Sequence, residues 1–285
     1  MLQTGMLKPK IIQIINFIAA LLFVATLSGG NAAATVCQSE PSSEIGTDLL
    51  VKTNIVGVGV ITGWGVAKWD YFSKSPNTVS EGWFSAATKS GGADKLGHMY
   101  TSYVTTHGLS YFYETRCFNK EDAAFYGALS SFAIMTYMEF GDSFSDIGFS
   151  HEDFISNVVG ITLGNILYKN AELSKKVDIR WEYGLHRDKG DFTTDYENSK
   201  YLVALKFSGF ESTRSGLLRY LELHGGYYTR GFSNPAHEKE RNPYLGVGVN
   251  LSELLRERSY KKTATFFNYI QIPGTYVAID RHIGN

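Results

Sequence analysis

The apolar residues change from a helical period to strict alternation near Lys176, and this change constrains the fold more than any other feature. In residues 177–185, apolar side chains occupy every second position and charged side chains stand between them. This period is typical of a β-strand with one apolar and one polar face. Four further segments read as strands, at residues 201–207, 217–232, 243–251 and 274–280. Because an outer-membrane barrel needs about eight strands to close, we expect a packed sheet or a partial barrel instead.

The preceding part of the chain reads as helices separated by polar loops. The expected elements are an apolar, glycine-rich segment and three helices, at residues 54–72, 94–113, 121–140 and 151–168. The uncharged stretches of these helices, about 15 residues long, fit the core of a helical bundle and a short membrane span equally well. Gly160 and Gly164 stand four positions apart, a spacing that favours close helix–helix contact in either setting.

The first 34 residues read as a signal peptide. Two lysines form a basic start, residues 11–27 are apolar, and three alanines ending at Ala34 offer a small-residue cleavage site. We expect cleavage after Ala34, and the alternative is an uncleaved membrane anchor. A lipoprotein signal needs a small residue directly before the modified cysteine, so Val36 before Cys37 disfavours lipidation.

The sequence therefore predicts an α+β protein. We expect a signal peptide at 1–34, a glycine-rich, membrane-associated helical domain at 35–172, and an antiparallel, strand-rich region at 173–285 packed on it.

Net charge and cysteine usage narrow the class of partner. Removal of the signal takes away two lysines and no acid, so the formal net charge changes from −1 to −3. No basic stripe remains and no phosphate-binding glycine–lysine loop occurs, so we expect neither a nucleic acid nor a nucleotide as partner. Cys37 and Cys117 can pair in an oxidising compartment or remain two free thiols, and spacing alone does not decide.

Three motifs in order carry a resemblance to a known family. They are Asp-Lys-x-x-His at 94–98, Glu-x-x-Asp at 139–142, and Gly-Phe-Ser-x-x-Asp-x-x-x-Asn-x-x-Gly at 148–160. Over roughly residues 60 to 170 the chain resembles the YfiM-like family of uncharacterised bacterial predicted envelope lipoproteins, and more distantly the VanZ-like membrane proteins. The resemblance implies an exported protein in the periplasm or envelope membrane of a Gram-negative bacterium. It implies membrane association and no established reaction.

Polar side chains form stripes that begin at two helix N-termini. Asp94 and His98 are four positions apart and share a helix face, and so do Asp153 and Asn157 on the last helix. Glu139, at the end of the preceding helix, and Asp142, in the loop after it, complete the expected cluster.

Such a cluster is able to transfer protons or hold a cation. We expect His98 to be the catalytic proton-transfer group near neutral pH, oriented by Asp94, Glu139 and Asp153. The same four residues are the expected ligands of a divalent cation, for which one Asp-x-x-x-His pair is a weak signal. No other cofactor is indicated. The expected binding residues are Asn157, Asp142, Ser150 and Lys95.

The same residues also fit a purely structural interpretation. Asp94 is placed to cap its helix, Ser150 and Asp153 have the spacing of a capping box, and Asn157 is able to fix the register of packed helices. Lys95, one step round the helix, is expected to reach solvent or a lipid headgroup.

These observations favour an envelope, membrane-associated protein with a binding or supporting role. One alternative is an enzyme that acts on a lipid-linked or cell-wall substrate through His98 with Asp94, Glu139 and Asp153. A second alternative is a structural assembly protein. A membrane lipid or another envelope component is the expected partner, and protein partners stay open. Neither a Gly-x-Ser-x-Gly turn nor a His-Glu-x-x-His motif occurs in the sequence.

Overall fold

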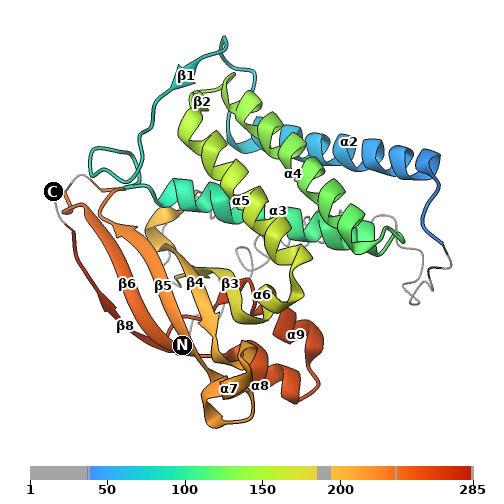
Figure 1. Cartoon of the computed structure of the whole chain (residues 1–285). Helices are drawn as coiled ribbons and strands as arrows, with labels where there is room; N and C mark the ends of the chain where they lie inside the picture. The colour runs from blue at the N-terminus through green and yellow to red at the C-terminus, as the bar shows by residue number, and fades with distance from the viewer. Residues whose placement is uncertain (1–36, 38, 185–193, 235, 284–285) are drawn as a thin grey trace, which may run out of the picture. The chain divides into compact units, whose positions relative to one another are not determined.

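The fold is α+β, as the change of period predicts. The structure is a computed structural model that describes residues 37, 39–184, 194–234 and 236–283. Helices dominate the described chain up to Lys176, and a six-stranded sheet dominates the part that follows (Figure 1). The predicted signal peptide at 1–34 lies outside the described residues.

The contacts divide the chain into two units that do not follow the expected boundary at residue 172. The first unit contains the described residues up to 78 together with 105–149, and the second contains 79–104 together with 150–283. The second unit therefore combines the sheet with helical segments that the sequence groups with the helical domain.

The first unit consists of α2 (Ser43–Lys68), α4 (Lys120–Asp142) and the C-terminal part of α3 (Ala93–Glu114). The side chain of Asn119 begins α4 by accepting a hydrogen bond from the Asp122 N–H at 2.9 Å. The core of this unit is aromatic and aliphatic, with Leu109, Phe112, Tyr113, Ala123 and Ile134 buried together. The predicted helices 94–113 and 121–140 are thus confirmed to within two residues.

Helix α2 is the one helix among the described residues that is long and apolar enough to cross a membrane. An 18-residue window of it has a mean hydropathy of 1.5, and only 17% of that window is buried. Ile45 and Ile55 are more than 60% exposed on its surface. Length and composition alone also fit an N-terminal signal or a core helix, so membrane association stays a prediction.

Cys37 and Cys117 form a disulfide bond, which decides between the two states left open above. Their Cα atoms lie 5.4 Å apart, a separation that a disulfide spans, and 80 positions separate them in sequence. The bond ties the start of the described chain to the end of α3 within the first unit.

We expect the Cys37→Ser/Cys117→Ser double variant to be less stable than the wild type by about 2–4 kcal/mol, because the bond closes a long loop in the unfolded chain. Thermal unfolding followed by circular dichroism measures this difference. A reductant should lower the melting temperature of the wild type and leave the double variant unchanged. Thiols that react with iodoacetamide in the native, unreduced protein would contradict the bond.

The second unit contains the N-terminal part of α3, helix α5 (His151–Lys169), several short helices and the sheet. The strands are β3 (Val177–Tyr183), β4 (Ser199–Lys206), β5 (Leu221–Arg230), β6 (Glu240–Val249), β7 (Ile270–Gln271) and β8 (Tyr276–Asp280). Their order is β7-β3-β4-β5-β6-β8. Most neighbours are antiparallel, as predicted, but β7 pairs in parallel with β3, so the sheet is mixed.

Two helices of this unit approach each other through a glycine. A Cβ atom at Gly160 of α5 would lie 2.0 Å from the carbonyl oxygen of Met99 on α3, which no side chain can tolerate. The predicted close contact at Gly160 is therefore confirmed. The core beneath these helices consists of Tyr100, Tyr103, Leu167, Ile179 and Tyr201.

Candidate functional site

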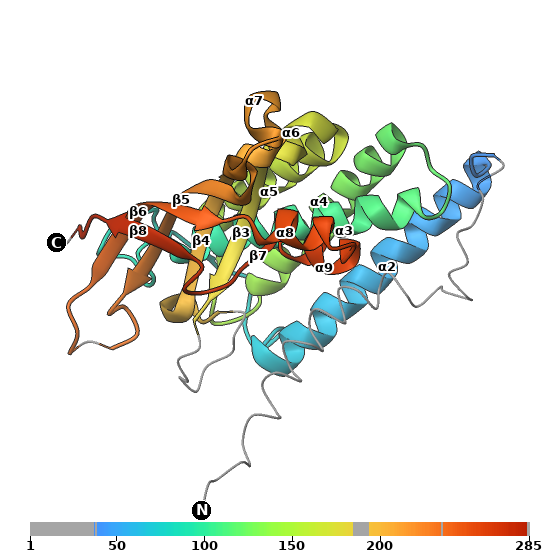
Figure 2. The same cartoon turned by 90° about the horizontal axis from the view of Figure 1, so that it is seen from below.

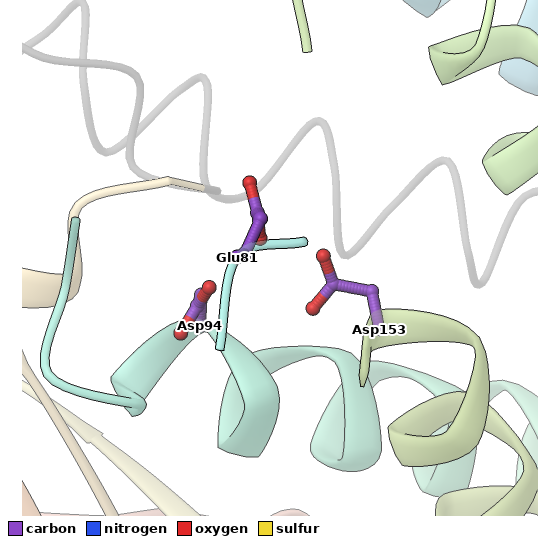
Figure 3. Close-up of side chains that lie close together, drawn as sticks. All are labelled: Glu81, Asp94 and Asp153. Atoms are coloured by element: carbon purple, nitrogen blue, oxygen red, sulfur yellow. The ribbon is translucent and has the colours of Figure 1, made fainter. Parts of the chain in front are cut away.

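Several of the polar residues predicted from the sequence lie at the start of two helices of the second unit. Asp94 and Lys95 lie in the first turn of α3, and Asp153 lies in the first turn of α5. A third acid, Glu81, comes from the loop that follows β1 (Thr78–Val79). Figure 3 shows the carboxyl groups of Glu81, Asp94 and Asp153 directed toward one another. One oxygen of each lies within 4.8 Å of the others.

The ammonium group of Lys95 lies between these three carboxylates. Its Nζ donates to Glu81 Oε2 at 2.5 Å, to Asp94 Oδ2 at 2.7 Å and to Asp153 Oδ1 at 2.8 Å. An ammonium has three donors, so this set uses all of them. The expectation that Lys95 reaches solvent or a lipid headgroup is wrong, because the residue is only 2% exposed. Its ion pairs with Glu81, Asp94 and Asp153 hold the ammonium inside the cluster instead.

Burial and the neighbouring charges shift the pKa values of two carboxyl groups of this cluster in opposite directions. Burial raises the pKa of Glu81, the hydrogen bond from Lys95 lowers it, and Asp153 raises it again, which gives about 7. Burial also acts to raise the pKa of Asp153, but the charges of His98 and Lys95 outweigh it and hold that pKa below its usual range. Near neutral pH, Glu81 is therefore the carboxyl group of this cluster that takes up a proton.

The other predicted residues of this unit take structural positions around the cluster. His98 Nε2 lies 3.8 Å from Asp153 Oδ1. Ser150 Oγ accepts a hydrogen bond from the Asp153 N–H at 3.2 Å, which confirms Ser150 as the N-cap of α5. Asn157 Oδ1 accepts from Ser102 Oγ at 2.8 Å, so these buried polar groups join α3 to α5. Asp94 is not an N-cap, because α3 begins one residue before it.

Glu139 and Asp142 belong to the first unit, where both are buried at the end of α4. Burial and the charges of Asp142 and Glu139 raise the pKa of Tyr71 in the same unit, and the Tyr71 hydroxyl donates to the Met138 carbonyl at 2.9 Å. Their expected association with His98 stays a prediction.

Glu81 and Glu152 are the residues that the sequence analysis missed. Glu152 Oε1 accepts from Ser80 Oγ at 3.0 Å and from the Gly82 N–H at 3.1 Å, so it fastens the loop that carries Glu81. A signal for Glu81 exists, since it is the one acid between residues 71 and 93.

Two tyrosines close the cluster from the sheet side. A Cβ atom at Gly97 would lie 2.8 Å from the Tyr196 ring and 2.9 Å from the Tyr201 hydroxyl, so the glycine allows both rings to reach α3. Burial is the main cause that raises the pKa of each phenol, and the charge of Asp94 adds to it. Both phenols therefore stay neutral near neutral pH.

The donor set fits a cation poorly while Lys95 keeps its position. Three carboxylates within 4.8 Å of one another are a common ligand set for a divalent cation. The centre of this set, however, already receives the ammonium of the protein itself. A metal ion would have to displace Lys95 from three ion pairs.

One family model matches the chain. Its description is "Predicted periplasmic lipoprotein (DUF2279)", and it matches residues 80–169, roughly a third of the chain. The matched segment contains every residue of the Lys95 cluster. No match was found among curated proteins or among solved structures. The match supports an uncharacterised envelope family and the predicted export to the bacterial periplasm or envelope, whereas the YfiM-like and VanZ-like resemblances stay predictions.

The family description meets one conflict in this chain. A lipoprotein carries its lipid on the sulfur of a cysteine near the mature N-terminus. The sulfur of Cys37 is bonded to Cys117, so it is not able to hold a thioether-linked lipid at the same time. The disulfide and the valine before Cys37 therefore both argue against a lipid on Cys37.

We expect the Glu81→Gln variant to flatten the pH dependence of stability. Glu81 has an ordinary pKa of 4.5 in the unfolded chain and about 7 in the folded protein. Its contribution to stability is therefore complete below about pH 4.5 and is lost as the pH rises through about 7. The uncharged variant lacks this loss, so its free energy of unfolding should fall less than that of the wild type across this window.

Urea unfolding at half-unit pH intervals measures both profiles. The pKa of Asp153 is lowered below its ordinary value of 3.8, so its contribution changes at a pH below this window. Glu211→Gln, at an exposed acid of the same unit, is the control and should follow the wild type. Parallel profiles for Glu81→Gln and wild type would show that Glu81 does not titrate near neutral pH.

Proposed function

We propose that the protein has a supporting, non-catalytic role in the bacterial envelope, and that its polar cluster holds the fold rather than a ligand. The observation that carries the proposal is the position of the Lys95 ammonium between Glu81, Asp94 and Asp153. A substrate or cation at this centre would need the position that the side chain fills.

The network joins segments that are distant in sequence. The ion pairs of Lys95 reach 14 residues back to Glu81 and 58 residues forward to Asp153. Glu152 holds the same loop through Ser80 and Gly82. Loss of one partner of a buried charge pair leaves the other charge without compensation, which is strongly destabilising. These contacts therefore fix the positions of the loop, α3 and α5 relative to one another.

An envelope enzyme is the second candidate, and one observation favours it. The pKa of Glu81 is raised and that of Asp153 is lowered, and His98 Nε2 lies 3.8 Å from Asp153 Oδ1. Carboxyl groups separated in this way are found in acid–base catalysis. His98, whose side chain is 18% exposed, would then transfer protons on a lipid-linked or cell-wall substrate.

We expect Lys95→Met to unfold about 3–5 kcal/mol more easily than the wild type, because it leaves three carboxyl groups, whose side chains are at most 15% exposed, without their cation. Chemical unfolding measures the loss. Lys89→Met, at an exposed lysine of the same unit, is the control and should be neutral. The triple variant Lys95→Met/Glu81→Gln/Asp153→Asn should recover part of the loss, since it removes charges together with their partner.

Two results would contradict the supporting role. Mg²⁺ or Ca²⁺ could raise the melting temperature of the wild type, an effect that Asp153→Asn abolishes, and the cluster would then be a cation site. Alternatively, purified protein incubated with lipid-linked cell-wall precursors could give a new product, detected by mass spectrometry and absent with His98→Ala.

A further inference from the structure

The sheet of the second unit has charged residues on its buried face. Arg180 donates to Asp178 at 2.8 Å and to both oxygens of Glu222, and Lys206 donates to Asp178 at 2.6 Å. His224 contacts Glu222 at 2.8 Å. All five are at most 3% exposed. Since successive residues of a strand point to opposite faces, the apolar residues between them point the other way.

The opposite face is apolar and largely exposed beyond the part that the helices of this unit cover. We call its exposed residues the outer apolar face: Val203, Leu223, Leu245, Val247, Val249, Val277 and Ile279. Exposure rises toward the edge strand β8, where Val277 is 80% and Ile279 83% exposed. Figures 1 and 2 show β8 at the edge of the sheet, beside β6.

Strand register makes these residues one continuous surface. Leu245 pairs with Ile279, and Val247 pairs with Val277 on one side and Leu223 on the other. With strands about 4.8 Å apart, each cross-strand row is about 14 Å wide over four strands. A patch of this kind on an otherwise folded protein marks a surface that another apolar surface covers.

The composition of the outer apolar face indicates whether lipid or a protein partner covers it. Its seven residues are valine, leucine and isoleucine, without the aromatic, methionine or arginine side chains that anchor protein–protein interfaces. Strands with aliphatic residues on one face and polar residues on the other are typical of sheets that face lipid. The chemistry therefore favours acyl chains over a protein partner.

One end of the sheet carries exposed positive charge. Residues 251–262, which form α8 (Leu251–Glu257) and the start of α9 (Lys261–Phe266), follow directly after β6. They contain four basic and two acidic residues, in a chain whose formal net charge is −1. We call their exposed basic residues the basic end: Arg256, Arg258, Lys261 and Lys262. Figures 1 and 2 show α8 and α9 together at this end of the strands.

We propose that the outer apolar face docks on a membrane that contains anionic phospholipid, with the basic end at the headgroups. Burial of the apolar rows in the membrane interface favours binding, and the positive charge of the basic end complements anionic lipid headgroups. Tyr260, 60% exposed between the basic residues, is of the type that lies at the membrane interface. This docking does not depend on the Lys95 cluster, so either proposal can fail alone.

A fluorescent probe on β8 tests the contact directly. The two native cysteines are bonded to each other, so an Ile279→Cys variant offers one free thiol for an environment-sensitive NBD label. We expect its emission to rise several-fold, with a blue shift, on vesicles of phosphatidylethanolamine and phosphatidylglycerol at 3:1. Lipids with a nitroxide on the acyl chain should quench it. Ala236→Cys, exposed in the same unit, is the matched control and should not respond.

The outcomes separate the possible occupants. An unchanged Ile279 signal on vesicles would overturn the proposal, even if the protein binds them through another segment. A signal that rises with protein concentration in the absence of lipid would also overturn it, and would assign the face to a second copy of the chain. Melting temperatures of both labelled variants should match the wild type, because both positions are exposed.

A second variant tests the basic end. Lys261→Gln/Lys262→Gln should weaken binding to the anionic vesicles about tenfold, while binding to phosphatidylcholine vesicles stays as in the wild type. Salt at 0.5 M should reduce the difference between variant and wild type on anionic vesicles. Equal loss on both vesicle types would overturn the assignment of these lysines to the headgroups.

Discussion

The buried ammonium of Lys95 is the interaction on which the arrangement of loop, α3 and α5 depends. Its three hydrogen bonds fix one atom from each of three segments. Burial of a charge is costly unless partners surround it, and here three acids do so. The excess negative charge is resolved by the raised pKa of Glu81, which is able to hold a proton near neutral pH. Such a centre gives geometric specificity more than stability.

The sheet also surrounds a lysine ammonium with side chains of the same chain. Lys200 lies above the rings of Tyr228, Tyr244 and Tyr276, at 4.7, 5.8 and 5.6 Å, and 3.4 Å from Glu182. An aromatic cage with an acid at its side is a known way to bind a cationic ligand, yet here the cation is part of the chain. Both the acidic cluster and the tyrosine cage resemble cation-binding sites, and in each of them a lysine of the same chain takes the position of the cation.

The sequence predicts what depends on local period and fails where charges meet over long distances. Helices 94–113 and 151–168 follow from the local sequence pattern, and Ser150 takes its predicted place as the cap of the second one. The contact of Lys95 with Asp153 joins positions 58 apart, and no periodicity reports it. Charge also misleads in β3, because alternation identifies two faces but does not say which is buried. Arg180, at 2% exposure, shows that a paired charge can take the inner one.

The buried charges and the outer apolar face are two consequences of one alternation. A strand that directs Asp178 and Arg180 inward must direct Val177, Ile179 and Trp181 to the other face. Near β3 this face is packed, since Ile179 lies in the core with Tyr100 of α3. Toward β8 the same face continues as Val277 and Ile279, which no described residue of the unit buries. Polar side chains at these edge positions would suit water better, so their apolar character fits a partner surface that the described residues of this unit do not supply.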